Sequence, residues 1–127
     1  MNSRTFFVIG LVSGLLSVAL GAFAAHGLKS QLSAEMLSAF ETGVRYQMYH
    51  SLALFVVGYA LGIYARRQFA IAGWLFVGGI LLFSGSLYAL AMTETTWLGA
   101  VTPLGGLAFL SGWLVLGYGF WKVQTVT

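Results

Sequence analysis

Residues 5–28 read TFFVIGLVSGLLSVALGAFAAHGL and contain no Asp, Glu, Lys or Arg. A helix needs about 20 predominantly apolar residues to cross the roughly 30 Å hydrocarbon core of a bilayer. Three further stretches without these charged residues follow, at Tyr46–Ala65, Gln68–Thr93 and Thr95–Trp121. The sequence therefore predicts an all-α, polytopic membrane protein, a bundle of four transmembrane helices.

The composition agrees with a membrane protein and excludes several other classes. The chain is 59% hydrophobic and 7% charged, against about 25% charged in a soluble domain. A chain of 127 residues is too short to bury so much apolar surface, so that surface must face lipid, and residues 1–127 form one domain. There is no cysteine, which excludes disulfides and thiolate metal sites. The net charge of +3 comes from few residues, and without a basic stripe we expect no nucleic-acid partner.

The positive charges predict the orientation in the membrane. Cytoplasmic loops carry an excess of Lys and Arg. With the N-terminus inside and four crossings, the cations without acidic neighbours all lie inside: Arg4, Arg66, Arg67 and Lys122. We therefore expect a multi-pass protein of the inner (plasma) membrane with both termini in the cytoplasm.

The second helix is predicted to be unusually long. Ser33 is a plausible N-cap, and the chain reads as helical from Ala34 to about Ala65, or about 48 Å at 1.5 Å per residue. Its first part must lie along the interface or tilt. This N-terminal half is amphipathic: apolar residues recur at helical spacing opposite a broad polar face that includes Arg45 and His50. The apolar stripe is Leu37, Phe40, Val44, Met48, Leu52 and Phe55.

Breaks and caps define the other helices. We expect the first helix to run from Thr5 to Ala25 and to be broken by His26-Gly27. The third is predicted over Phe69–Met92. The fourth should start at Pro103 with Thr102 as its cap, and residues 97–101 should form an interfacial loop or a short turn.

Glycines recur at intervals typical of helix packing. Small residues let membrane helices approach closely, and a seven-residue spacing keeps them on one side of a helix. The 17 glycines include the series Gly105, Gly112 and Gly119, so we expect a glycine-packed bundle. The same faces could also support a homo-oligomer.

A small set of polar residues forms the candidate site. Glu41 and Arg45 have the spacing of an i,i+4 ion pair, which is either a binding or proton-relay site or an interfacial pair that orients the helix. His26 and His50 could approach each other, but without HExxH spacing a metal site is disfavoured. The cluster, ligand-binding or structural, is His26, Glu41, Arg45, Tyr46, Tyr49 and His50.

Nothing in the sequence points to catalysis. There is no nucleophile elbow and no phosphate-binding glycine loop, so we expect no enzyme, no catalytic residue, no metal and no cofactor. The hydroxyls of Ser84, Ser86 and Thr102 could bond between helices or to their own backbone.

Six strings along almost the whole chain form a recognisable set. They are Gly21-Ala22-Phe23, Ala25-His26-Gly27-Leu28, Phe40-Glu41-Thr42, Val44-Arg45-Tyr46-Gln47-Met48-Tyr49-His50, Phe83-Ser84-Gly85-Ser86-Leu87-Tyr88 and Thr102-Pro103-Leu104-Gly105-Gly106. These strings resemble a widespread family of small membrane proteins of unknown function, which includes bacterial inner-membrane proteins and the eukaryotic transmembrane protein 256. The loop Thr93-Glu94-Thr95 departs from the family pattern. The resemblance implies a four-helix inner-membrane protein and brings no reaction, substrate or catalytic residue with it.

Three functional hypotheses are considered, of which a membrane enzyme is the least favoured because no nucleophile–base set is visible. The first is a structural protein that binds membrane lipids or a partner, although the sequence identifies no protein partner. The alternative is a small oligomeric transporter or channel that uses Glu41, Arg45 and His50. Transport requires Glu41 or His50 to face an aqueous cavity.

Overall fold

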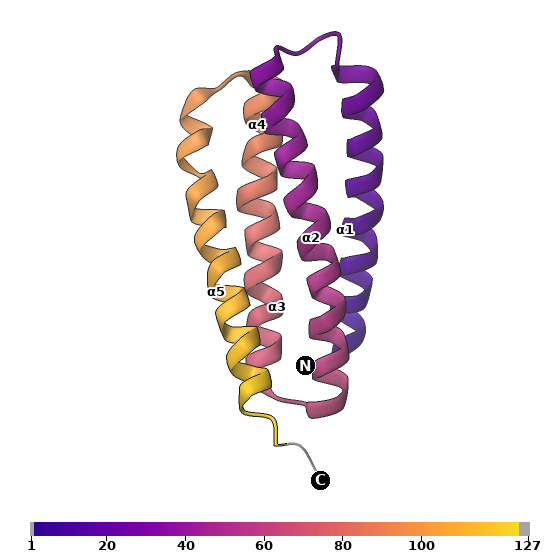
Figure 1. Cartoon of the computed structure of the whole chain (residues 1–127), viewed down its shortest axis with the longest axis vertical. Helices are drawn as coiled ribbons and strands as arrows, with labels where there is room; N and C mark the ends of the chain where they lie inside the picture. Colours follow the sequence, from indigo (N-terminus) through magenta and orange to yellow (C-terminus); the bar gives the residue numbers. More distant parts are fainter. Residues whose placement is uncertain (1, 125–127) are drawn as a thin grey trace.

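The computed structural model describes residues 2–124 and contains four long antiparallel helical rods (Figure 1). No strand occurs in that range. The first rod is α1 (Ser3–Phe23) continued by the π-helical segment η1 (Ala24–Leu28), and the second is α2 (Ala34–Tyr64). The third rod comprises α3 (Arg67–Gly79), the π-helical segment η2 (Ile80–Ser84) and α4 (Gly85–Thr93). The short 3₁₀ helix η3 (Thr96–Ala100) leads into α5 (Thr102–Trp121), the fourth rod.

The ends of α2 are formed as its sequence suggests. The Ser33 hydroxyl accepts a hydrogen bond from the Met36 N–H at 3.2 Å, which confirms Ser33 as the N-cap. At the other end Ala65 has a φ of 49°, the left-handed conformation that commonly terminates a helix. The 31 residues between them span about 46 Å, so the prediction of an overlong second helix is confirmed.

Two predicted helix boundaries are wrong. His26-Gly27 does not break the first helix, which continues as η1 to Leu28. Glycine is compatible with membrane helices, and here Gly27 leaves room for the Phe23 ring, which a Cβ would meet at 2.8 Å. Thr102 is not a cap, because it is already helical and Val101 precedes it as the N-cap. The turn expected at residues 97–101 is present as η3.

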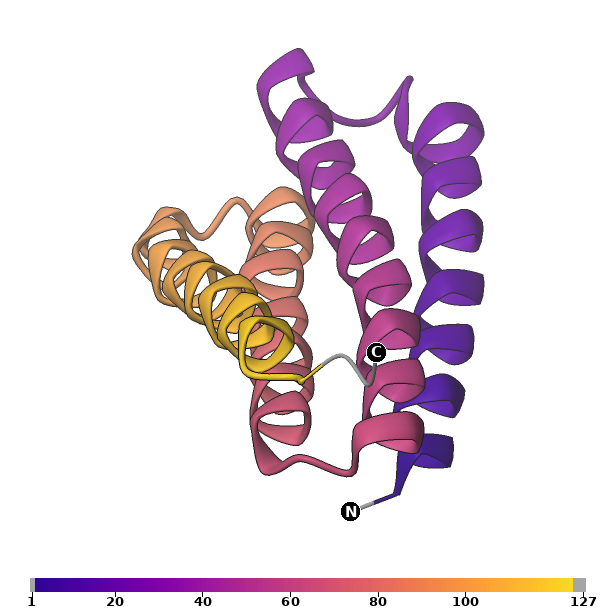
Figure 2. The same cartoon turned by 60° about the horizontal axis from the view of Figure 1, so that its bottom comes forward.

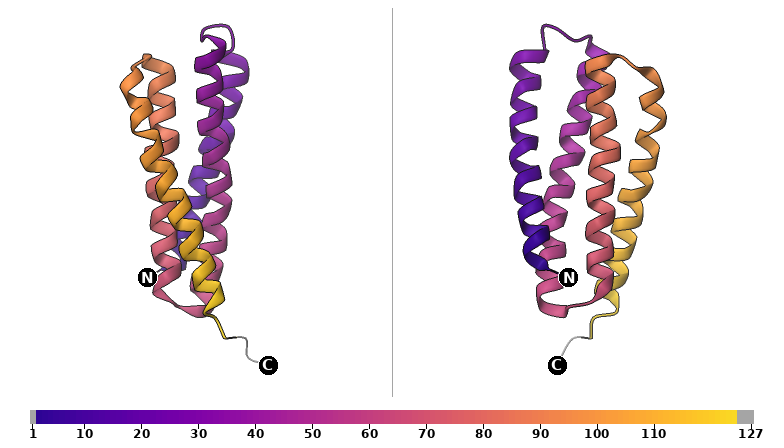
Figure 3. Two further views of the ribbon diagram at one scale, coloured as in Figure 1. Left: turned by 60° about the vertical axis from the view of Figure 1, so that its left-hand side comes forward. Right: turned by 180° about the vertical axis from the view of Figure 1, so that it is seen from behind.

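The rods form two hairpins that meet along α2. α1 packs mainly against α2, and α5 packs mainly against α3 and η2. α2 also contacts α3 and α4, which joins the hairpins. Figures 2 and 3 show that α1 and α5 lie at opposite ends of this arrangement and that α5 crosses α3 at an angle. α1 reaches α3 mainly through Phe6, whose ring packs on Gly73 and meets Trp74 edge to face with centroids 5.1 Å apart.

At the interface between α3–η2 and α5, glycines of α5 pack against phenylalanines of the neighbouring helix. A Cβ on Gly112 would meet the Phe76 ring at 2.7 Å, and one on Gly119 would meet the Phe69 ring at 2.8 Å. Gly105 lies against the backbone of Phe83 itself. Both series repeat every seven residues, so each of these three glycines of α5 faces one phenylalanine of the antiparallel α3–η2 segment. The packing expected for these glycines is present.

Two clusters of buried side chains fill the bundle. The larger one lies in the half nearer the α2–α3 turn and includes Phe6, Leu54, Val57, Phe69 and Phe76. The smaller one lies at the opposite end and is formed by Ala24, Leu28, Phe40 and Ala91. Buried polar residues of α1 and α2 lie between these clusters.

Three segments are long and apolar enough to cross a bilayer: Ser3–Leu28, Arg67–Thr93 and Thr96–Trp121. α2 is long enough but is not among them, because Gln47, His50 and Ser51 lower its hydropathy. These three polar residues are buried, whereas Leu52 of the predicted apolar stripe is 54% exposed. The buried face of α2 is thus partly the polar one, which is reasonable where the surroundings of the bundle are apolar.

Candidate functional site

The side-chain amide of Gln47 connects three helices in the middle of the bundle. Its Nε2 donates to the backbone carbonyl of Ser13 on α1 at 2.8 Å. Its Oε1 accepts from the Tyr88 hydroxyl on α4 at 2.6 Å. Gln47 is only 5% exposed. Because a carbonyl accepts and cannot donate, the Ser13 contact fixes which end of the amide carries the nitrogen.

Serine hydroxyls extend these contacts along α2. The hydroxyls of Ser13 and Ser51 are hydrogen-bonded at 2.7 Å, and Ser51 also donates to the Gln47 carbonyl at 2.7 Å. Ser17, one turn after Ser13, donates to the Val44 carbonyl at 2.9 Å. In the described residues every buried side-chain nitrogen and oxygen has a partner, as an apolar environment demands.

The second hairpin is held by hydroxyls that bond both between helices and within one. Ser84 donates to the Gly43 carbonyl of α2 at 2.7 Å. Ser86 bonds the Phe83 carbonyl within its own helix, and its Oγ lies 2.6 Å from the Thr102 Oγ1 of α5. Both the interhelical and the local alternatives are therefore realised.

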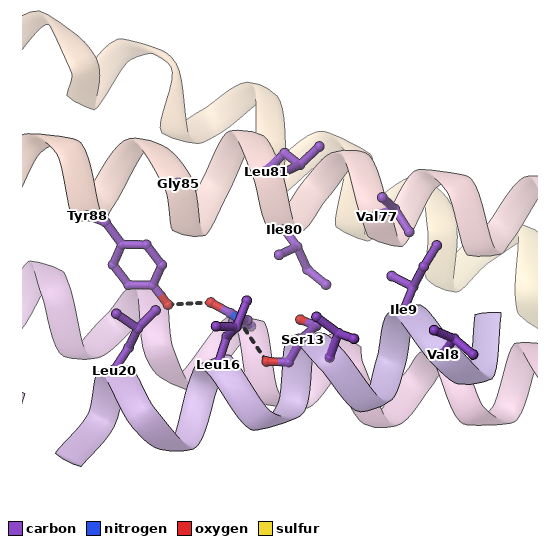
Figure 4. A pocket seen from close by; sticks show the side chains of 12 residues that line it. Val8, Ile9, Ser13, Leu16, Leu20, Val77, Ile80, Leu81, Gly85 and Tyr88 are labelled. Carbon is purple, nitrogen blue, oxygen red and sulfur yellow. Dashed lines mark hydrogen bonds between the residues drawn. The ribbon is translucent and has the colours of Figure 1, made fainter. Parts of the chain in front are cut away.

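A groove of about 450 Å³ opens between α1 and the α3–η2–α4 rod, beside the Gln47 amide. Figure 4 shows Val8, Ile9, Ser13, Leu16 and Leu20 on one wall and residues from Val77 to Tyr88 on the other. The floor residues Ser13 and Gln47 are buried, whereas Leu81 at the rim is 69% exposed. The groove thus opens sideways, away from the bundle axis. The lining residues are Val8, Ile9, Val12, Ser13, Leu16, Leu20, Gln47, Val77, Ile80, Leu81, Gly85 and Tyr88, and none is charged.

The π-helical segment η2 forms the centre of one wall. Ile80 and Leu81 come from η2, and Gly85 and Tyr88 lie in α4. A π-helical turn inserts a residue and rotates the next part of the helix, and such turns occur frequently at functional sites. At Gly85 a Cβ would meet nothing within 4 Å, so this wall has an open notch.

His50 lies outside the groove, in an aromatic cluster between α2, α3 and α5. Its ring stacks on Phe109, with centroids 3.5 Å apart, and also contacts Phe76. Its Nδ1 lies 2.7 Å from the Tyr46 carbonyl, and Trp113 Nε1 donates to its Nε2 at 3.0 Å. A carbonyl only accepts and an indole N–H only donates, so the imidazole is neutral with its proton on Nδ1.

The structure brings together three residues of the predicted cluster. Tyr46 stacks on His50, and Tyr49 contacts Tyr46 edge to face. The expected ion pair is wrong: Arg45 donates instead to Thr42 Oγ1 at 3.0 Å, and residues 2–124 contain no ion pair between Glu41 and Arg45. Arg45 is exposed, and an exposed ion pair gains little because it must hold two long side chains in one geometry. A single bond to the nearby Thr42 hydroxyl avoids that cost.

The two histidines do not approach each other. His26 is exposed in η1, whereas His50 lies sixteen residues after Ala34, about 24 Å from the start of α2. In the described part of the chain, no group of three His, Cys, Asp or Glu residues could hold a metal ion. The approach of His26 and His50 is therefore a wrong prediction, because α2 runs away from η1.

Sequence reasoning missed the residues that connect the helices, which are Ser13, Ser17, Gln47, Ser51 and Tyr88. A signal for them was present. Ser13 and Ser17 are four residues apart and so share one face of an apolar helix, and Gln47 lies in a stretch without Asp, Glu, Lys or Arg. Polar groups in such segments almost always face the bundle interior.

Comparison with known proteins places the chain in a family. Residues 20–106 match the family described as "Protein of unknown function (DUF423)". The chain belongs to the DUF423 family. This range contains the whole of α2 and the groove wall formed by α3, η2 and α4.

Relatives of this DUF423 protein are described as membrane proteins. UPF0382 membrane protein YwdK of Bacillus subtilis is 46% identical over 114 residues, which cover 89% of this chain and 93% of the relative. A UPF0382 membrane protein of Haemophilus influenzae is 45% identical over 129 residues, which cover 99% and 100%. No solved structure matches the chain. The DUF423 protein is an integral membrane protein, and these relatives assign it no activity.

Proposed function

We propose that this DUF423 protein crosses the inner membrane four times and binds a membrane lipid in the groove between α1 and α3–η2–α4. Both termini lie in the cytoplasm, in line with Arg4, Arg66, Arg67 and Lys122 at the same end of the bundle as the α2–α3 turn. The ligand is a lipid, and the protein acts by binding and not as an enzyme. Self-association remains compatible with this role.

One observation carries the proposal: the groove is apolar, opens sideways and has a volume of about 450 Å³. Ligand sites of about 300–1,000 Å³ are lined mostly by apolar side chains with a few polar groups that orient the ligand. The three polar lining residues Ser13, Gln47 and Tyr88 match this description. A sideways opening in a membrane helix bundle faces lipid chains, which can enter it without passing through water.

The geometry gives less support to transport. His50 is 4% exposed and surrounded by aromatic rings, and both ring nitrogens already have partners. Neither His50 nor Glu41 lines the groove. A proton or ion relay through these residues would need the aromatic cluster to open first.

The test compares the lipids that remain bound after extraction. Wild type, Gly85→Leu and Gly117→Leu are purified in a mild detergent and examined by native mass spectrometry. Gly85 lines the groove, whereas Gly117 is exposed on α5 and does not, and a Cβ on either meets nothing within 4 Å. We expect wild type and Gly117→Leu to retain lipid and Gly85→Leu to lose at least about 90% of it.

The thermal stability of all three proteins is measured in the same samples. Gly85→Leu should remain folded, since leucine is a good helix former. Equal lipid retention by a folded Gly85→Leu and wild type would contradict the proposal.

A further inference from the structure

We infer that the lipid bound in the groove is uncharged and carries a hydroxyl group, which binds to the Gln47–Tyr88 pair. This inference rests on the proposed function and specifies its ligand. It depends on the hydrogen-bonding capacity that the two side chains leave unused at the groove surface.

Gln47 has one donor to spare. A primary amide has two N–H donors, and Gln47 gives one of them to the Ser13 carbonyl at 2.8 Å. The other has no hydrogen-bond acceptor among residues 2–124. Gln47 lines the groove, and its unused N–H is the donor that we assign to a ligand there.

Tyr88 has an acceptor to spare. Its hydroxyl proton goes to Gln47 Oε1 at 2.6 Å, which leaves the lone pairs of Oη. The ring is held by Phe40, with centroids 4.8 Å apart, and by the notch at Gly43, where a Cβ would meet the ring at 2.8 Å. Figure 4 shows the hydroxyl pointing from α4 towards α1 across the groove.

A hydroxyl complements this pair because it both accepts and donates. It can accept the free N–H of Gln47 and donate its proton to Tyr88 Oη. A carbonyl or ether could only accept, and a hydrocarbon could do neither. An ionised headgroup does not fit, because no charged residue lines the groove and an unpaired charge at membrane depth is costly.

The groove also determines where the apolar part of the ligand lies. Beyond the pair, the walls continue with Ile9 and Val8 on α1 and Ile80 and Val77 opposite (Figure 4). A hydrocarbon chain that lies along these residues places its hydroxyl end beside Gln47. The Gln47–Tyr88 pair therefore recognises the hydroxyl group of a lipid alcohol, and the apolar walls of the groove hold its hydrocarbon chain.

The experiment uses three probes of matched chain length: hexadecanol, its methyl ether and hexadecane. Each is added to delipidated full-length protein in mild detergent, and the bound fraction is measured by native mass spectrometry. The variants are the double substitution Gln47→Leu/Tyr88→Phe, which removes every hydrogen-bonding group of the pair, and, as a matched control, Ser86→Ala. Ser86→Ala removes a neighbouring interhelical contact, from Ser86 to Thr102, and Ser86 does not line the groove.

We expect wild type and Ser86→Ala to bind hexadecanol about tenfold more tightly than hexadecane, since two hydrogen bonds in an apolar site together provide about this factor. The methyl ether should fall between them. In Gln47→Leu/Tyr88→Phe, where the pair offers neither a donor nor an acceptor, the preference for the alcohol should disappear while hexadecane binding is kept.

Two other outcomes separate this inference from the proposed function. If wild type binds all three probes equally, the hydroxyl preference is wrong and the lipid groove stands. If wild type binds none of the probes and retains no lipid on purification, the proposed function itself is wrong and the inference fails with it.

Discussion

His50 is held in one tautomer by two partners of opposite type, a carbonyl on its own helix and an indole N–H from α5. The Trp113 bond joins α2 to α5, and so joins the two hairpins. If either bond were broken in an apolar environment, water would not replace the missing partner of the imidazole. We therefore interpret His50 as a residue that holds the two hairpins together and not as a proton relay.

A double-mutant cycle tests whether the His50–Trp113 hydrogen bond stabilises the fold. Trp113→Phe and His50→Phe remove the two ends of the bond, and we expect a coupling free energy of about 0.6–1.7 kcal/mol, the range for polar contacts between membrane helices. The free energy of unfolding is measured by steric trapping in bicelles. Trp121→Phe is the control, because Trp121 is 85% exposed and should show no coupling to His50. A coupling below about 0.3 kcal/mol would contradict the assignment.

For single residues, the sequence predicts which side chains form the candidate site better than it predicts their contacts. The predicted cluster groups Tyr46, Tyr49 and His50 with His26, Glu41 and Arg45, and the structure joins the first three through ring contacts. The Glu41–Arg45 pair was expected from spacing alone, but spacing does not include the competing Thr42 hydroxyl. The partner of Gln47 is 34 residues away in the chain, and helical periodicity carries no information about such distant contacts.

At the scale of elements, the glycine–phenylalanine register fixes how α5 lies on α3. Gly105 is the tightest point, since a Cβ there would overlap the backbone of Phe83. A side-chain clash can be relieved by a rotamer change, but a backbone clash requires the helices to separate. The neighbouring Gly106 has nothing within 4 Å of its Cβ position.

These neighbours provide a matched pair of substitutions. Gly105→Ala should destabilise the protein by about 1–3 kcal/mol, as expected for overpacking. Gly106→Ala should leave stability within about 1 kcal/mol of wild type, because alanine is the better helix former. Unfolding in mixed micelles, followed by far-ultraviolet circular dichroism, measures both. Equal stabilities would show that the helices are not in close contact at Gly105.

A helix could be predicted from the sequence where local features alone, such as a cap residue, determine its ends. Ser33 and the long uninterrupted helical pattern are enough to predict α2. The π-helical segments η1 and η2 were not predicted, because they depend on how side chains fit against other helices. η2 is the more important omission, since it forms the centre of one groove wall.

For the whole molecule, the decisive question is whether α2 crosses the membrane. The chain lacks cysteine, so single cysteines can be introduced without other substitutions. We expect Ser30→Cys and Thr95→Cys to react with a membrane-impermeant maleimide on intact cells, or on spheroplasts where an outer membrane is present. Ala65→Cys and Gln124→Cys should react only after the inner membrane is permeabilised. These positions are uncharged neighbours of the turns and ends, so the charge pattern that sets orientation is preserved.

An alternative topology gives a different labelling pattern. If α2 lies along the interface, Ala65→Cys will react on the same side as Ser30→Cys. The number of crossings was predicted from the lengths of the apolar stretches. Hydropathy alone supports three crossings. A hydropathy average counts the polar side chains of α2 as if they faced lipid, although the folded bundle gives them hydrogen-bond partners.

The hydrogen bonds of Gln47 and Ser51 to Ser13 also have a consequence for membrane insertion during synthesis. α1 is synthesised first and reaches the bilayer as an apolar segment that needs no companion. α2 comes next, with an amide and a hydroxyl whose partners are the carbonyl and hydroxyl of Ser13. Isolated in lipid, the Gln47 amide would lack its Ser13 partner, whereas the Ser51 hydroxyl could still bond the Gln47 carbonyl of its own helix. We therefore expect α1 and α2 to enter the bilayer together as a hairpin, in which α1 provides the partner for the amide of the next helix.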